Sequence, residues 1–227
     1  MSKNLFITGT GTDIGKTYVS ALIVKKLRES GKNAAYYKAA MSGNVPDAEG
    51  RLIPGDALQV KTVSGIAQPL ETMCPYVYEA AVSPHLASRM EGNPVQLSVV
   101  HQTFQAVCRQ YDYVTVEGSG GIVCPLRFDE ERLGLDDLVK KLKLSSLIVA
   151  DAGLGTINSV VLTAEYMRAN GLTVKGIILN KFHPGDTMEE DNRFMCEAMT
   201  GLRVLACVRH GDTGLAMDAD ALASLYE

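Results

Sequence analysis

Short apolar runs alternate with longer segments of helical periodicity along the chain. Apolar runs at residues 5–8, 34–38, 114–116, 147–150, 176–179 and 204–208 predict strands. The segments between them predict helices at residues 17–30, 57–64, 84–90, 95–110, 135–143, 157–170 and 187–200. Wholly apolar strands separated by helices are typical of a parallel sheet covered on both faces. We therefore predict an α/β fold with a mostly parallel sheet.

The sequence shows no repeat, low-complexity tract or linker that would divide it. Its 227 residues are enough for one α/β domain with a large core. We predict a single domain over residues 1–227. Because ligands of parallel sheets bind at the carboxyl ends of the strands, polar residues that directly follow predicted strands are the candidates for a functional site.

Composition excludes several classes of function. A net charge of −4 argues against a general nucleic-acid binder, which usually carries a basic excess. No apolar run approaches the length that spans a bilayer, and no export signal precedes the first strand, so we expect a cytoplasmic protein. The five cysteines are scattered, which predicts reduced thiols, and the dispersed histidines predict no zinc site.

A glycine-rich segment, Thr8–Thr17, joins the first strand to the first helix. Successive backbone N–H groups in such a turn bind phosphates, aided by the positive end of the helix dipole. Lys16 would neutralise the β- and γ-phosphates, and the Thr17 hydroxyl would ligate Mg²⁺. The spacing differs from the usual phosphate loop, since Thr10 stands at the first glycine position. The segment predicts an ATP-dependent enzyme of the P-loop class that requires Mg²⁺.

Two further strands end in charged residues. Glu117 follows an apolar strand, the arrangement of an acid that reaches Mg²⁺ directly or through water, and residues 118–121 (GSGG) predict a sharp turn beside the substrate. Lys38 ends the second strand, near the phosphate end of the sheet. Asp56 is placed to be the N-cap of the next helix, and the same carboxylate could also be a second protein ligand of Mg²⁺.

Taken in order, these segments resemble the dethiobiotin synthetase family of biotin biosynthesis. The resemblance rests on residues 9–17, 37–43, 56–58, 83–85, 116–121 and 154–158, and it runs to about residue 180. It implies a carbon–nitrogen ligase that uses ATP, CO₂ or bicarbonate, and 7,8-diaminononanoate. One amine captures CO₂ as a carbamate, the carbamate attacks the γ-phosphate, and the second amine displaces phosphate to close a cyclic urea.

The resemblance also implies roles for individual residues. Lys16, Lys38 and Thr12 would be catalytic, with Ser42 beside the carbamate or the transferring phosphate. Thr17, Asp56 and Glu117 would hold Mg²⁺. ATP would be bound by Asp13, Ile14, Gly15, Lys16, Thr17, Tyr18, Glu117, Gly118, Gly120 and, at the adenine edge, Asn180. The active enzyme would be a homodimer in which Gly155 and Asn158 of one subunit bind the diamine carboxylate held by the other.

The sequence departs from the family at two places. Gly11 stands where the family usually has Asp or Asn. After the sixth strand, Cys207–Gly211 differs from the turn that usually forms one side of the adenine-binding site in the family. One alternative is an amide-forming synthetase of the cobalamin type. Such enzymes normally add a glutamine-hydrolysing domain, for which 227 residues leave no room. A regulatory P-loop ATPase or GTPase switch would act on a protein partner, but residues 180–183 (NKFH) lack the Asp of a guanine-binding motif, and Gly11 replaces the signature lysine of partner-switching ATPases.

Overall fold

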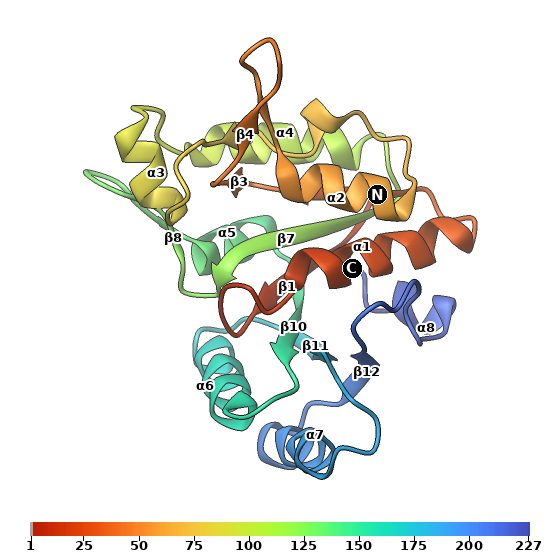
Figure 1. The fold of residues 1–227 in the computed structure, drawn as a ribbon. Helices are drawn as coiled ribbons and strands as arrows, with labels where there is room; N and C mark the ends of the chain where they lie inside the picture. The colour runs from red at the N-terminus through yellow and green to blue at the C-terminus, as the bar shows by residue number, and fades with distance from the viewer. Residues whose placement is uncertain (1) are drawn as a thin grey trace.

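A six-stranded parallel sheet forms the centre of the computed structural model, which describes residues 2–227 (Figure 1). Its strands lie in the order β12, β11, β10, β1, β7, β2, so the first strand of the sequence is central. Their bounds are β1 Lys3–Gly9, β2 Ala34–Lys38, β7 Tyr113–Gly121, β10 Ser145–Asp151, β11 Val174–Asn180 and β12 Val204–Val208. All five pairings are parallel, which confirms the predicted fold class.

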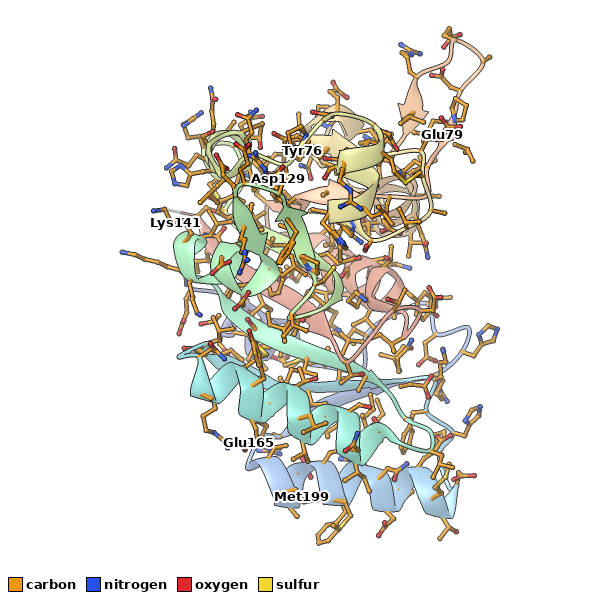
Figure 2. The ribbon with its side chains drawn as sticks, turned by 90° about the vertical axis from the view of Figure 1, so that its left-hand side faces the viewer. Tyr76, Glu79, Asp129, Lys141, Glu165 and Met199 are labelled. Carbon is orange, nitrogen blue, oxygen red and sulfur yellow. The ribbon has the colours of Figure 1, made fainter. Side chains whose placement is uncertain are left out.

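Helices cover both faces of this sheet and give the molecule two cores. On one face lie α1 (Lys16–Glu29), α2 (Gly55–Ser64) and the short α8 (Ala219–Ala223). On the other lie α4 (Leu97–Cys108), α5 (Leu135–Leu142), α6 (Thr156–Ala169) and α7 (Thr187–Thr200), while α3 (Pro84–Met90) packs against β8. Figure 2 shows α6 and α7 side by side, with Glu165 on α6 and Met199 on α7. The predicted helices are therefore all present, with bounds that shift by one or two residues.

The strand that carries Glu117 is longer than predicted. The sequence predicts a sharp turn at Gly118–Gly121, but β7 continues to Gly121 beside β1. The register moves from Ile7 opposite Glu117 to Gly9 opposite Gly121, so two extra residues of β7 form a bulge. Gly120 takes the positive φ of 68° within it. The prediction of a turn was wrong because a bulge uses the same glycines without ending the strand.

Several elements were not predicted because they are too short to show a period. Three strand pairs lie around the carboxyl side of the sheet, and β4 with β5 forms the hairpin that projects furthest from it (Figure 1). These elements are β3 Ala40–Met41, β4 Val45–Pro46, β5 Leu52–Ile53, η1 Leu70–Thr72, β6 Tyr76–Val77, β8 Pro125–Phe128 and β9 Arg132–Gly134.

The C-terminal tail is part of the core. Leu222 and Tyr226 are buried against the α1 face, and the Tyr226 hydroxyl lies 2.6 Å from that of Thr115 on β7. The backbone of Glu227 exchanges two hydrogen bonds with that of Asn4 on β1. The last residues thus close the amino-terminal end of the sheet beside its central strand.

We predict that Leu222→Ala destabilises the protein by about 2–5 kcal/mol, because the leucine is fully buried and its loss leaves a cavity. Urea denaturation measures the change in the free energy of unfolding. Leu58→Ala is the matched control, since this α2 leucine is 42% exposed and should cost clearly less. Equal losses in the two variants would contradict a core role for the tail.

Candidate active site

A cavity of about 780 Å³ opens at the carboxyl ends of β1, β7 and β2. Most residues that the sequence singled out meet there, although they come from separate strands, loops and helices. The lining includes Thr12, Asp13, Gly15, Lys16, Thr17, Tyr18, Lys38, Ser42, Asp56, Glu117 and Gly120. The parallel arrangement produces this convergence, since it brings all strand ends to one edge of the sheet.

The phosphate loop ends at Gly15, which precedes the first residue of α1. Gly15 has a φ of +86°, and a Cβ there would lie 2.1 Å from Nδ2 of Asn180, so this position requires glycine. Asn180 donates that amide to the backbone carbonyl of Ile14 at 2.9 Å. The end of β11 therefore holds the turn that opens α1, whose first N–H groups have no partner within the helix and would be the ones to bind a phosphate.

Lys16 lies over the same loop. Its Nζ donates to the carbonyl of Gly11 at 2.8 Å, so the residue that departs from the family pattern contributes its backbone here. Burial lowers the pKa of Lys16, and the nearby charge of Lys38 lowers it further. The protein alone therefore does not stabilise this ammonium well, which favours the approach of an anionic ligand.

A cluster of charged groups lines the same cavity. Lys38 is buried and its Nζ donates to Oε1 of Glu117 at 2.8 Å and to Oδ2 of Asp56 at 2.5 Å. The Thr17 hydroxyl donates to the same Oε1 at 2.9 Å. Asp56 lies inside the first turn of α2, whose N-cap is Pro54, so the alternative that Asp56 caps this helix is wrong.

The two carboxylates control the charge of Lys38. Burial alone would lower its pKa, but Glu117 and Asp56 outweigh burial and raise it. Burial alone would raise the pKa of Asp56, but the charge of Lys38 and the hydrogen bonds from Lys38 and Thr17 together outweigh burial and lower it. Lys38 and Asp56 therefore stay ionised at neutral pH, and the Lys38 ammonium donates to both carboxyl groups.

The donor groups around Lys38 fit a magnesium ion. Mg²⁺ prefers hard oxygen ligands and keeps several positions for water and phosphate. Thr17, Asp56 and Glu117 offer oxygen only, and the position of Lys38 shows that positive charge is stabilised between the carboxylates. Within residues 2–227 no three His, Cys, Asp or Glu side chains gather into a metal-binding group. The remaining ligands of a bound Mg²⁺ would therefore come from nucleotide phosphate and water.

Five predicted residues lie outside the cavity. Ile14 packs toward the α1 core, and Asn180 is buried against the phosphate loop. Gly118 lies close to the Phe6 ring, which would be only 2.7 Å from a Cβ at this position. Gly155 and Asn158 lie at the start of α6, beyond the end of β10. Within one chain, the segment predicted to bind the carboxylate of the diamine therefore does not line the cavity that contains Lys16.

The cavity also has lining residues that sequence reasoning missed. Gln59 lies three residues after Asp56 on α2, a spacing that places both on one side of the helix and could have identified it. Ser119 donates its hydroxyl to the carbonyl of Ala40 at 2.8 Å and so ties the β7 bulge to β3. Cys124 also lines the wall, and nothing in the sequence marks it among the five cysteines.

Comparisons with known proteins identify the family of this chain. A family model described as an AAA domain matches residues 3–213. The ATP-dependent dethiobiotin synthetase BioD of Brachyspira hyodysenteriae is 46% identical over 228 residues, covering 100% of both chains. The chain belongs to the dethiobiotin synthetase family. The enzyme of the same name from Clostridium perfringens is 46% identical over 208 residues, 92% of this chain and 91% of that protein. The family similarity extends past residue 180, and it does not favour a regulatory switch.

Solved structures share the fold. The septum site-determining protein MinD of Pyrococcus horikoshii, complexed with Mg-ADP, superposes with a TM-score of 0.56 at 14% identity, over 92% of this chain and 82% of that one. The MinC:MinD cell division protein complex of Aquifex aeolicus superposes with a TM-score of 0.55 at 14% identity, over 92% of this chain and 81% of that one. At this identity the likeness shows the P-loop fold alone.

We predict that Lys16→Gln folds normally but loses ATP-dependent turnover by about 10²-fold or more. The lowered pKa of Lys16 means that folding does not gain from its charge, so the neutral amide should not reduce Tm. Turnover at saturating ATP and thermal unfolding are measured together. Lys26→Gln, near the far end of α1, is the control and should keep its activity. Near-normal turnover in Lys16→Gln would remove Lys16 from the phosphate site.

We also predict that Glu117→Gln and Asp56→Asn each raise the Mg²⁺ concentration needed for half-maximal turnover, because an amide is a poorer ligand than a carboxylate. Glu117→Gln should also lower Tm more than Asp56→Asn, since Glu117 is buried against Lys38 whereas Asp56 is partly exposed. Glu49→Gln, on the exposed β4–β5 hairpin, is the control. Unchanged Mg²⁺ titrations would make both carboxylates partners of Lys38 only.

Proposed function

We propose that this protein is an ATP-dependent dethiobiotin synthetase, a carbon–nitrogen ligase that closes the ureido ring of dethiobiotin. Its substrates are 7,8-diaminononanoate, CO₂ or bicarbonate, and ATP, and its products are dethiobiotin, ADP and phosphate. We further propose that residues 1–227 act as one domain in the cytoplasm. No helix among residues 2–227 is long and apolar enough to cross a membrane.

The proposed chemistry has three bond-forming steps. One amine adds to the carbon of CO₂ and loses a proton, giving a carbamate. A carbamate oxygen then attacks the γ-phosphorus, the bond to the β-phosphate oxygen breaks, and ADP leaves with its electrons. The second amine attacks the carbonyl carbon of the resulting carbamic-phosphoric anhydride, the bond to the phosphate oxygen breaks, and loss of one proton completes the cyclic urea.

The observation that supports this reaction best is that two lysines line one cavity. Carbamate and triphosphate are both anionic, so they repel one another unless fixed positive charge lies between them. Lys16 and Lys38 supply that charge from the phosphate loop and from the end of β2. Thr12 and Ser42 add hydroxyl groups to the same walls, where they can bind carbamate or phosphate oxygens.

The remaining polar groups prepare the site without forming covalent bonds. Thr17, Asp56 and Glu117 would hold Mg²⁺, and the ion, when bound with the nucleotide, supplies charge neutralisation of the phosphates. Asn180 fixes the loop through Ile14, and its amide oxygen remains available to the adenine edge. The proposed reaction needs no side-chain nucleophile, because each bond is formed by a substrate atom.

We propose a homodimer with a shared diamine site. Gly155 and Asn158 lie at the start of α6, where free N–H groups suit a carboxylate, and both are exposed away from the cavity. The diamine carries its carboxylate at the far end of an apolar chain from its amines. A partner related by twofold symmetry would bring its own α6 start to that end of the substrate.

Product formation tests the proposed activity. ADP release is followed with ATP and Mg²⁺ in the presence or absence of the diamine and bicarbonate, and the product is identified by mass. We expect release that requires both substrates and yields dethiobiotin. Lys16→Gln, purified in the same way, controls for contaminating ATPases. ADP release that is independent of the diamine would contradict the proposal and favour a regulatory ATPase.

Mixed dimers test the shared site. We predict that Lys16→Gln and Gly155→Asp are each inactive as homodimers, because one lacks the phosphate-side charge and the other adds a repelling carboxylate at the α6 start. Hybrids of the two should recover partial activity, since one of their two sites is intact. Hybrid formation is confirmed by native mass. Hybrids that form but stay inactive would show that each chain builds its own complete site.

A further inference from the structure

Tyr36 is a fully buried tyrosine beneath the catalytic cavity. It lies on β2 two residues before Lys38, and both side chains point to the α1 face of the sheet. The cross-strand partners of Tyr36 and Lys38 on β7 are Thr115 and Glu117. Tyr36 and Glu117 are therefore diagonal neighbours on one face, a separation of about 7–8 Å between backbones that an aromatic side chain can span.

Two buried polar atoms in this region have no hydrogen-bond partner. One is the hydroxyl of Tyr36, and the other is Oε2 of Glu117. Oε1 of Glu117 is already occupied, since it accepts from Thr17 and from Lys38. The hydroxyl of Thr115, directly beside Tyr36, is also occupied, because it pairs with Tyr226 at 2.6 Å.

The two atoms without partners are chemically complementary. A phenol at neutral pH donates one hydrogen bond, and a carboxylate oxygen only accepts. Leaving either buried and unpaired costs about 1–3 kcal/mol, and the cost is greater for a charged group. Oε2 is enclosed by the protein, so neither bulk water nor a ligand in the cavity satisfies it.

We propose that the Tyr36 hydroxyl donates a hydrogen bond to Oε2 of Glu117, directly or through one internal water molecule, and so positions this carboxylate. With Oε2 held inside the sheet, Glu117 presents only Oε1 to Thr17, Lys38 and a bound Mg²⁺. Tyr36 touches no substrate in this arrangement and acts entirely through Glu117. The metal-side role rests on the proposed function, whereas the hydrogen bond itself does not.

Removal of the hydroxyl tests the proposal through the sign of a stability change. If the hydroxyl bonds to Glu117, Tyr36→Phe leaves a buried charged oxygen without a donor, and the ligand-free protein should melt a few degrees lower. If the hydroxyl has no partner, the same change removes an unsatisfied group and should raise Tm or leave it unchanged. A Tm that is not lowered overturns the proposal.

The Mg²⁺ dependence of ADP binding, measured by calorimetry, provides the second readout. Tyr36→Phe should raise the Mg²⁺ concentration for half-maximal binding by about twofold to tenfold, the effect of losing one hydrogen bond. Tyr37→Phe is the matched control, because its hydroxyl contacts the Val100 carbonyl at 3.0 Å and Thr103 at 2.8 Å on the opposite face. It should lower Tm without changing the Mg²⁺ dependence. If both variants leave that dependence unchanged, Tyr36 does not position Glu117 toward the metal.

A double-mutant cycle separates pairing from general packing. In a Glu117→Ala background Oε2 is absent, so Tyr36→Phe should no longer lower Tm. Equal effects of Tyr36→Phe in the two backgrounds would show that the hydroxyl does not act on Glu117. The melting and ADP arms use no diamine and detect no dethiobiotin. They therefore decide the role of Tyr36 even if the chain makes another product.

Discussion

The buried ion pair between Lys38 and Glu117 is the constraint around which this site is organised. The two side chains lie opposite one another on the neighbouring strands β2 and β7 and are almost fully buried, so each is the other's counter-charge. Removing either one would leave an unpaired charge in the interior, which is far more costly than losing an exposed pair. Thr17 and Asp56 join the pair from two different helices, and this links the phosphate loop, β2, β7 and α2 into one unit.

The periodicity of the sequence was sufficient for the sheet and its helices, because each of those elements is long enough to repeat its pattern. Two-residue strands such as β4 and β6 contain no period, and α8 is a single short turn whose burial depends on packing against α1. The glycines after Glu117 were ambiguous for a different reason. Glycine permits a turn and a bulge equally, and only the pairing with β1 decides between them.

The site was predictable where a motif fixes both residue type and position, as at Lys16, Thr17 and Glu117. It was not predictable where two strands or helices must first be placed beside each other. Asp56 is an example, since its pairing with Lys38 depends on how α2 is placed beside β2, and the sequence was also compatible with a helix cap. The adjacent tyrosines 36 and 37 are another: the sequence does not show which one lies on the face of Glu117.

The central position of β1 also has a consequence for how the chain folds. β1 pairs with β7 and β10, more than 100 residues later, and its Asn4 pairs with Glu227. Such distant contacts give the topology a high contact order, which slows folding. A chain emerging from the ribosome must therefore keep an apolar strand unpaired until most of the protein has been made, a period in which it is exposed to aggregation.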